Sequence, residues 1–122
     1  MLYHQPLVNV PGFSALAMQV SFPPGAQSPP HRHGGASVMA VVISGTSYNK
    51  MNCTPTLKLK AGESWYEEPG CHHVTSANAS DTEPLVLLAT FVVETKVIVE
   101  GGAAALVVVD EEYKDVQIAV EM

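Results

Sequence analysis

The sequence is poor in basic residues. Its 122 residues include six Lys and Arg against twelve Asp and Glu, and Arg32 is its single arginine. No basic stripe is available to neutralise phosphates, which argues against a nucleic-acid partner. The same shortage argues against binding to an anionic membrane surface.

Long apolar segments and a cationic leader are also missing. The longest apolar runs, such as residues 85–93, are far too short to cross a bilayer. Residues 1–12 lack the charged start and the apolar stretch of a secretory signal. We therefore expect the two cysteines, Cys53 and Cys71, to be free thiols in a reducing compartment. The expected location is the cytoplasm.

Helical patterns are scarce, whereas strand patterns recur along the chain. No window places apolar residues at helical spacing behind a capping residue. Segments that alternate or are rich in β-branched residues predict strands, with Gly and Pro turn signals between them. The predicted strands are residues 14–22, 36–44, 46–53, 56–60, 63–68, 73–80 and 84–100. Residues 36–44 look buried on both faces, and 84–100 look like one long strand or two with a bend near Glu94.

Many short strands in a chain of this length predict a single all-β domain, a sandwich or a barrel, over residues 1–122. We expect its core at about residues 12–100 and further strands within 103–122. The apolar runs at 106–109 and 116–120 are expected to be edge strands or to pack on a second subunit.

Four of the five histidines lie in two short stretches. On a strand, His31 and His33 point to one face, about 7 Å apart, and can converge on a metal ion. The second stretch places Glu67 before a Pro–Gly turn and His72 or His73 at the start of the next strand. A third imidazole from that strand would complete a facial site with open positions for water, oxygen or substrate.

The first histidine stretch resembles the first motif of the cupin superfamily. In that motif a glycine precedes the His-x-His pair by six positions, a glutamate follows the pair, and a second glycine follows the glutamate after six residues. Gly25, His31, His33 and Gly45 stand at matching positions here. The glutamate position holds Val38.

The second histidine stretch resembles the second cupin motif. Gly62, Gly70 and His73 stand at matching positions. Glu68 replaces a proline of the motif, and Asn78 stands one place later than the usual asparagine.

The resemblance implies an all-β fold, the double-stranded β-helix or jelly-roll barrel, with its site inside. It implies that His31, His33 and His73 are the metal ligands and that the usual fourth ligand is missing. This three-histidine pattern is similar to the cupin dioxygenases that cleave β-diketones with Fe(II). Those enzymes carry a glutamate six residues before the third histidine, and Glu67 stands at that position.

Two roles are open for Glu67: a fourth metal ligand, or an unbound catalytic general base. Three neutral imidazoles leave the full charge on a divalent metal, which favours an enolate ligand, and a bound carboxylate would weaken this effect. Trp65 is expected to share the face of Glu67 because the two positions alternate together. Val38, Trp65, Met18 and Met39 are expected to line the substrate cavity.

The resulting hypothesis is a metal-dependent enzyme for a small oxygenated organic molecule. We expect one divalent ion, with Fe(II) favoured and Zn(II), Mn(II) or Ni(II) possible, and dioxygenase-type cleavage of a carbon–carbon bond. One alternative is a non-redox decarboxylase, isomerase, dehydratase or cyclase. Another is a cupin that binds a small ligand without catalysis. The expected assembly is a homodimer.

Overall fold

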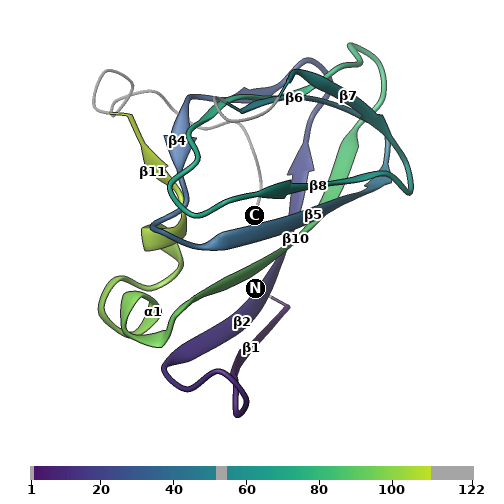
Figure 1. Ribbon diagram of the computed structural model, residues 1–122. Helices are drawn as coiled ribbons and strands as arrows, with labels where there is room; N and C mark the ends of the chain where they lie inside the picture. Colours follow the sequence, from purple (N-terminus) through teal and green to yellow (C-terminus); the bar gives the residue numbers. More distant parts are fainter. Residues whose placement is uncertain (1, 52–54, 111–122) are drawn as a thin grey trace.

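Two antiparallel sheets make up most of the computed structural model, which describes residues 2–51 and 55–110 (Figure 1). One sheet has the strand order β1 (Tyr3–Pro6), β2 (Phe13–Phe22), β10 (Leu85–Glu94), β5 (Ser37–Ser44) and β8 (Ser64–Glu67). The other has the order β11 (Val108–Val109), β4 (His31–Arg32), β9 (His73–Asn78), β6 (Thr46–Met51) and β7 (Leu57–Lys60), and β3 (Gln27–Ser28) also pairs with β9. The chain crosses from one sheet to the other at most connections; among the described strands, only β1–β2, β3–β4 and β6–β7 follow one another within a sheet.

The core lies between the two sheets, because the long strands alternate inward apolar and outward residues. In β2 the side chains of Leu16, Met18 and Phe22 are buried, whereas Gln19 is exposed. In β10 every second residue from Leu85 onward is buried. This period of two is the pattern that the sequence showed, and it places one face of each strand in the core.

The predicted strands over 14–22, 36–44, 56–60, 63–68 and 73–80 are confirmed, with ends shifted by one or two residues. The predicted strand 46–53 is confirmed as far as Met51, and its last two residues lie outside the described part of the chain. The prediction that 36–44 is buried on both faces is wrong. Val38 and Ala40 are buried, but Met39 is 40% exposed and Ile43 is 53% exposed on the outer face. Because no described element covers that face, the apolar run reflects strand propensity there and not burial.

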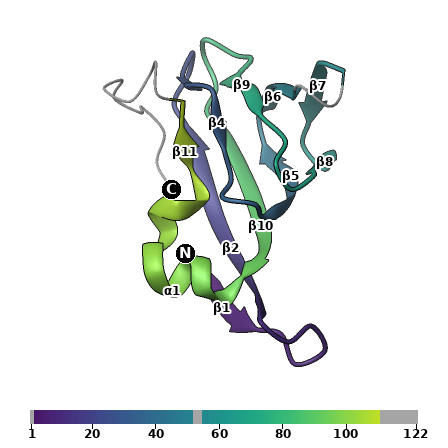
Figure 2. The ribbon, with the colours of Figure 1, turned by 60° about the vertical axis from the view of Figure 1, so that its left-hand side comes forward.

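The prediction that the last strand continues to residue 100 is also wrong. After β10 the chain forms the helix α1 (Thr95–Gly101), which lies at the end of the sheet away from β6 and β7 (Figure 2). The partner strand β2 pairs with β10 only as far as Phe13, opposite Glu94, so no neighbour remains for a longer strand. The helix buries Ile98 against the core, and this packing overrides the β-branched composition.

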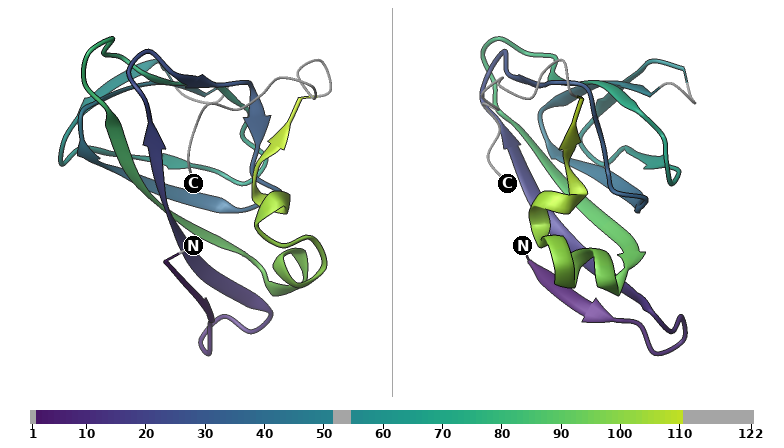
Figure 3. Two further views of the ribbon diagram at one scale, coloured as in Figure 1. Left: turned by 180° about the vertical axis from the view of Figure 1, so that it is seen from behind. Right: turned by 90° about the vertical axis from the view of Figure 1, so that its left-hand side faces the viewer.

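The C-terminal part of the described chain folds back over the open edge of the second sheet (Figure 3). A 3₁₀-helix, Ala103–Leu106, leads into β11, which pairs with β4. Of the apolar run at 106–109, residues 108–109 thus form an edge strand of their own chain, whereas Leu106 ends the 3₁₀-helix. The run at 116–120 lies outside the described residues, and the homodimer stays a prediction.

The expectation of a free thiol at Cys71 is wrong. This cysteine is buried and disulfide-bonded. The other cysteine, Cys53, lies outside the described residues. Since disulfides persist in oxidising compartments, the thiol argument for the cytoplasm no longer holds. Among the described residues, no helix is both long enough and apolar enough to cross a membrane.

Gly45→Ala tests the corner where the chain leaves β5 for β6. Gly45 has a φ of 88°, and an added Cβ would overlap the carbonyl oxygen of Pro84 and lie 2.9 Å from Cα of Leu85. Gly62→Ala is the matched control, because φ is 87° and the added Cβ meets nothing within 4 Å. Left-handed backbone alone costs about 1–2 kcal/mol. We expect Gly45→Ala to lose about 2 kcal/mol more than Gly62→Ala in urea unfolding. Equal losses would contradict this packing.

Candidate metal centre

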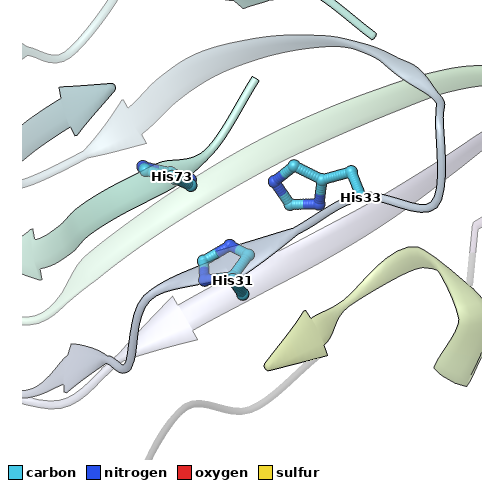
Figure 4. A group of neighbouring side chains, drawn as sticks. All are labelled: His31, His33 and His73. Carbon is cyan, nitrogen blue, oxygen red and sulfur yellow. The ribbon is translucent and has the colours of Figure 1, made fainter. Parts of the chain in front are cut away.

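Three histidines, from β4, from the segment that follows it and from β9, meet inside the barrel (Figure 4). His31 lies on β4 opposite His73, the first residue of β9, and His33 follows two residues after His31. One potential ligand nitrogen from each ring lies within 4.8 Å of the others. His31 and His73 are buried, and His33 is nearly so. The structure therefore brings the predicted set together.

The neighbouring polar residues point elsewhere. Arg32 is exposed, and its guanidinium donates to the carbonyl oxygen of Gly70 at 2.9 Å. His72 faces outward and pairs through Nε2 with the Asp110 carboxylate at 2.8 Å. Strand alternation explains both, because each lies next to an inward histidine. Of the two candidates in the second stretch, His73 is the one inside.

Glu67 brings a carboxylate to the same point from the facing sheet. It lies on β8 directly opposite Val38 of β5, and both residues are buried. Its Oε1 atom lies 3.1 Å from Nε2 of His33 and 3.1 Å from Nδ1 of His73. Its Oε2 atom accepts a hydrogen bond of 3.0 Å from the indole Nε1–H of Trp65. The carboxylate missing at position 38 is thus supplied by the neighbouring strand.

In each histidine, the ring nitrogen that points away from the cluster donates a hydrogen bond. His31 Nδ1–H donates to the Pro29 carbonyl at 2.8 Å, and His33 Nδ1–H donates to the Leu106 carbonyl at 2.8 Å. His73 Nε2–H donates to Oδ1 of Asn49. In neutral rings these bonds leave the lone pairs on Nε2 of His31, Nε2 of His33 and Nδ1 of His73.

The inward atoms fit a divalent cation. His33 Nε2, His73 Nδ1 and Glu67 Oε1 are fully buried and have no hydrogen-bond partner within the described chain. Lone pairs that face one another in a dry interior are costly unless a cation lies between them. The 3.1 Å separations between Glu67 Oε1 and the two imidazole nitrogens bring these donors close enough to bind one ion together.

The protonation states at neutral pH also suit a metal. Burial, and then the nearby charge of His73, lowers the pKa of His31 to about 4, so this imidazole is neutral. Burial alone would raise the pKa of the Glu67 carboxyl, but the influence of the neighbouring His33 and His73 side chains outweighs it and holds this pKa well below its usual range. Neutral imidazole and carboxylate are the forms that coordinate metal ions.

A cavity of about 60 Å³ adjoins these side chains. Its apolar lining consists of Val20, Phe22, Val38, Ala40, Trp65, Leu87, Ala89, Phe91 and Val107. Its polar lining consists of Ser28, His31, His33, Glu67, His73 and Ser76. Among these lining residues none is Lys or Arg, so Glu67 is the one carboxylate facing a space without a cationic side chain.

The structure places two of the four expected cavity residues in this lining, Val38 and Trp65. Met18 is buried in the core on the inner face of β2 but is not in the lining. Met39 does not line the cavity, because it lies between the inward residues Val38 and Ala40 and therefore points outward.

Sequence reasoning missed two further contributors. Asn49 comes from β6, far from both histidine stretches in the sequence. The C-terminal segment supplies the Leu106 carbonyl and the Val107 side chain. A polar residue at an inward position of an alternating strand, such as Asn49 between buried Ser47 and Met51, is the signal that could have identified the first.

Comparisons with known proteins agree with this arrangement. The family model described as "Cupin domain" matches residues 18–91, more than half of the chain. No curated protein sequence matches. The predicted all-β, double-stranded β-helix fold is confirmed by this match and by the solved structures of similar fold.

One such structure is an oxalate oxidase in complex with the substrate analogue glycolate, with 22% identity, a TM-score of 0.57, and coverage of 76% of this chain and 51% of that one. A predicted oxalate decarboxylase from Thermotoga maritima has 23% identity, a TM-score of 0.51, and coverage of 66% and 64%. The Cnp3 cupin domain of Schizosaccharomyces pombe has 20% identity, a TM-score of 0.57, and coverage of 77% and 61%. The chain spans about half the length of the oxalate oxidase. At these identities the likeness concerns the fold.

Gly34→Ala tests the contact between the His33 loop and the C-terminal segment. A Cβ at Gly34 would overlap the carbonyl oxygen of Ala105, next to the carbonyl that holds His33. We expect the displaced segment to release His33 and to weaken Zn(II) binding about tenfold in calorimetric titration. Gly35→Ala is the control, since its Cβ meets nothing within 4 Å. A loss of affinity that is the same in both variants would contradict the role of this contact.

The pKa of His31 predicts how acid affects the metal-free protein. Unfolded His31 takes up a proton near pH 6.5, but folded His31 does so only near pH 4. Between these values the unfolded state binds more protons, so folding stability falls as the pH falls, by about 3 kcal/mol over the window. Urea unfolding between pH 7 and pH 4.5 measures this slope. His31→Gln should flatten it, whereas the exposed control His4→Gln should not. An unchanged slope in His31→Gln would refute the prediction.

Proposed function

The chain belongs to the cupin family, and we propose that it is a metal-dependent enzyme whose His31, His33, His73 and Glu67 hold one divalent ion. The observation that carries the proposal is the convergence of three imidazoles and one carboxylate in a cavity that is otherwise apolar. Three of these atoms, His33 Nε2, His73 Nδ1 and Glu67 Oε1, are buried and have no polar partner within the described residues other than one another.

We assign Glu67 to the metal as a fourth ligand and not to a general base. A carboxyl with a pKa far below neutral accepts a proton poorly, and the neighbouring His33 and His73 side chains hold the pKa of Glu67 there. The Trp65 indole fixes one carboxylate oxygen and turns the other toward the histidines. Glu67 would then serve as the fourth ligand, in place of the first-motif glutamate whose position is occupied by Val38.

The size of the cavity favours a short substrate. One water needs about 10–15 Å³ of such space, so a cavity of about 60 Å³ holds a molecule of roughly four to six non-hydrogen atoms. A short aliphatic dicarbonyl is close to this size. A larger polyketide-like molecule would require Phe91, Leu87 or other wall residues to move.

The net charge of the site favours a substrate with one negative charge over a substrate with two. A divalent ion bound to the Glu67 carboxylate has a net charge of +1, which the enolate of a 1,3-dicarbonyl would neutralise. The dianion of oxalate would leave an excess negative charge in a cavity whose lining includes no Lys or Arg. The lining therefore favours a dicarbonyl enolate, even though two proteins of similar fold are described as an oxalate oxidase and a predicted oxalate decarboxylase.

The reaction that we propose is oxygen-dependent cleavage of the bond between one carbonyl carbon and the central carbon of the dicarbonyl, with Fe(II) as the metal. A bound Fe(II) would supply the reactivity toward O₂ and polarise the oxygens of the substrate. One O₂ is consumed per dicarbonyl. The two products, a carboxylic acid and a 2-oxoaldehyde, together contain both oxygen atoms of the O₂ and both oxygen atoms of the dicarbonyl. The apolar walls exclude water, and Glu67 and the histidines set the charge that the enolate meets.

Oxygen uptake by protein loaded with Fe(II) tests this proposal. With acetylacetone we expect one O₂ per molecule cleaved, and with oxalate no uptake. His33→Ala should abolish the activity because it removes a ligand, and His4→Ala should retain it because this residue is exposed on β1.

Absence of oxygen uptake with acetylacetone and other short 1,3-dicarbonyls would contradict the dioxygenase proposal. Turnover with Zn(II), Mn(II) or Ni(II) and without O₂ would support the non-redox alternative instead. Tight binding of a small ligand without turnover would support the non-catalytic alternative.

A further inference from the structure

We propose that Asn49 fixes the orientation and tautomer of His73, so that this histidine binds the metal through Nδ1 while His31 and His33 use Nε2. The inference rests on the metal site of the proposed function. It adds a positioning residue that neither histidine motif contains and a mixed set of ligand atoms. The observations are the hydrogen bond between Asn49 and His73 and the burial of both residues.

The position of Asn49 in the sheet lets its side chain form a hydrogen bond with His73. It is an inward residue of β6, has no exposed surface, and comes from the strand next to β9. In the register of that pair, Met51 is opposite His73 and Asn49 is opposite Ser76. The amide therefore reaches the His73 ring from the neighbouring strand, where its Oδ1 meets Nε2.

The chemistry of the amide oxygen determines the tautomer. Oδ1 can only accept a hydrogen bond, so Nε2 of His73 must carry the proton. In the neutral ring the lone pair is then on Nδ1, which lies 3.1 Å from Oε1 of Glu67. In His33 the proton is on Nδ1, which donates to the Leu106 carbonyl, so the lone pair is on Nε2. Both inward nitrogens thus face the same carboxylate oxygen.

Asn49 is the one side chain among these three outer contacts. His31 and His33 donate to the backbone carbonyls of Pro29 and Leu106, which a substitution at those positions leaves in place. The His73 contact can be removed by a single change at Asn49. A neutral amide also adds no charge, whereas a carboxylate there would reduce the net charge that a substrate enolate meets.

Long-range ¹H–¹⁵N NMR of the metal-free protein tests the tautomer directly. The ring signals of His73 are assigned by their loss in His73→Gln. We expect the Nε2–H tautomer for His73 and the Nδ1–H tautomer for His33. An Nδ1–H tautomer at His73 would overturn the proposal. Since this measurement involves neither metal nor substrate, its result is independent of whether the proposed reaction occurs.

Three variants test whether the contact matters for the metal. Asn49→Leu removes the acceptor and should weaken Zn(II) binding by about 10- to 100-fold. The His73 ring should then occur as a mixture of the Nδ1–H and Nε2–H tautomers. Asn49→Asp keeps an acceptor oxygen and should preserve both the Nε2–H tautomer and the affinity. Ser47→Ala is the control, because Ser47 is equally buried on the same face of β6 but its hydroxyl has no hydrogen-bond partner among the described residues.

Thermal unfolding of each variant separates loss of folding from loss of positioning. Zn(II) affinity in folded Asn49→Leu that equals that of Ser47→Ala would overturn the proposal. If the unmodified protein binds no Zn(II), the metal site itself fails, and the tautomer of His73 alone then decides the role of Asn49.

Discussion

The burial of four electron-rich atoms at one point is the constraint on which the rest of this structure depends. Imidazole nitrogens of His31, His33 and His73 and the Glu67 carboxylate leave water together, and buried lone pairs without a proton or cation between them destabilise a fold. A divalent ion bound to these lone pairs would stabilise them, and it can bind all four groups only in the folded barrel, where the strands lie together. Metal binding and folding are therefore expected to be linked.

The surrounding structure holds each of these groups from a different part of the chain. The Pro29 and Leu106 carbonyls, the Asn49 amide and the Trp65 indole each orient one of the four. Such outer contacts determine which atom faces the metal and how readily a ligand moves. Apolar residues from both sheets fill the remaining wall, so the charge inside is set by the ion and Glu67. A small, monoanionic substrate follows from this balance.

The sequence alone predicted the fold and the three histidines because both are encoded locally. Strand alternation and motif spacing indicated where His31, His33 and His73 would lie. Two features depended on contacts distant in the sequence. The pairing of Glu67 opposite Val38 follows from the register of β5 and β8, and the hydrogen bond of Asn49 follows from the pairing of β6 with β9. The helix α1 escaped prediction because it forms where the partner strand ends.

The most direct test of this account is the metal content of the protein purified without oxygen, measured by mass spectrometry beside His73→Ala. The account predicts about one divalent ion per chain in the unmodified protein and almost none in the variant, because the carboxylate and two imidazoles cannot replace the third. No metal in the unmodified protein, even after incubation with Fe(II) or Zn(II), would contradict it. The converging side chains would then be a buried polar cluster without a metal.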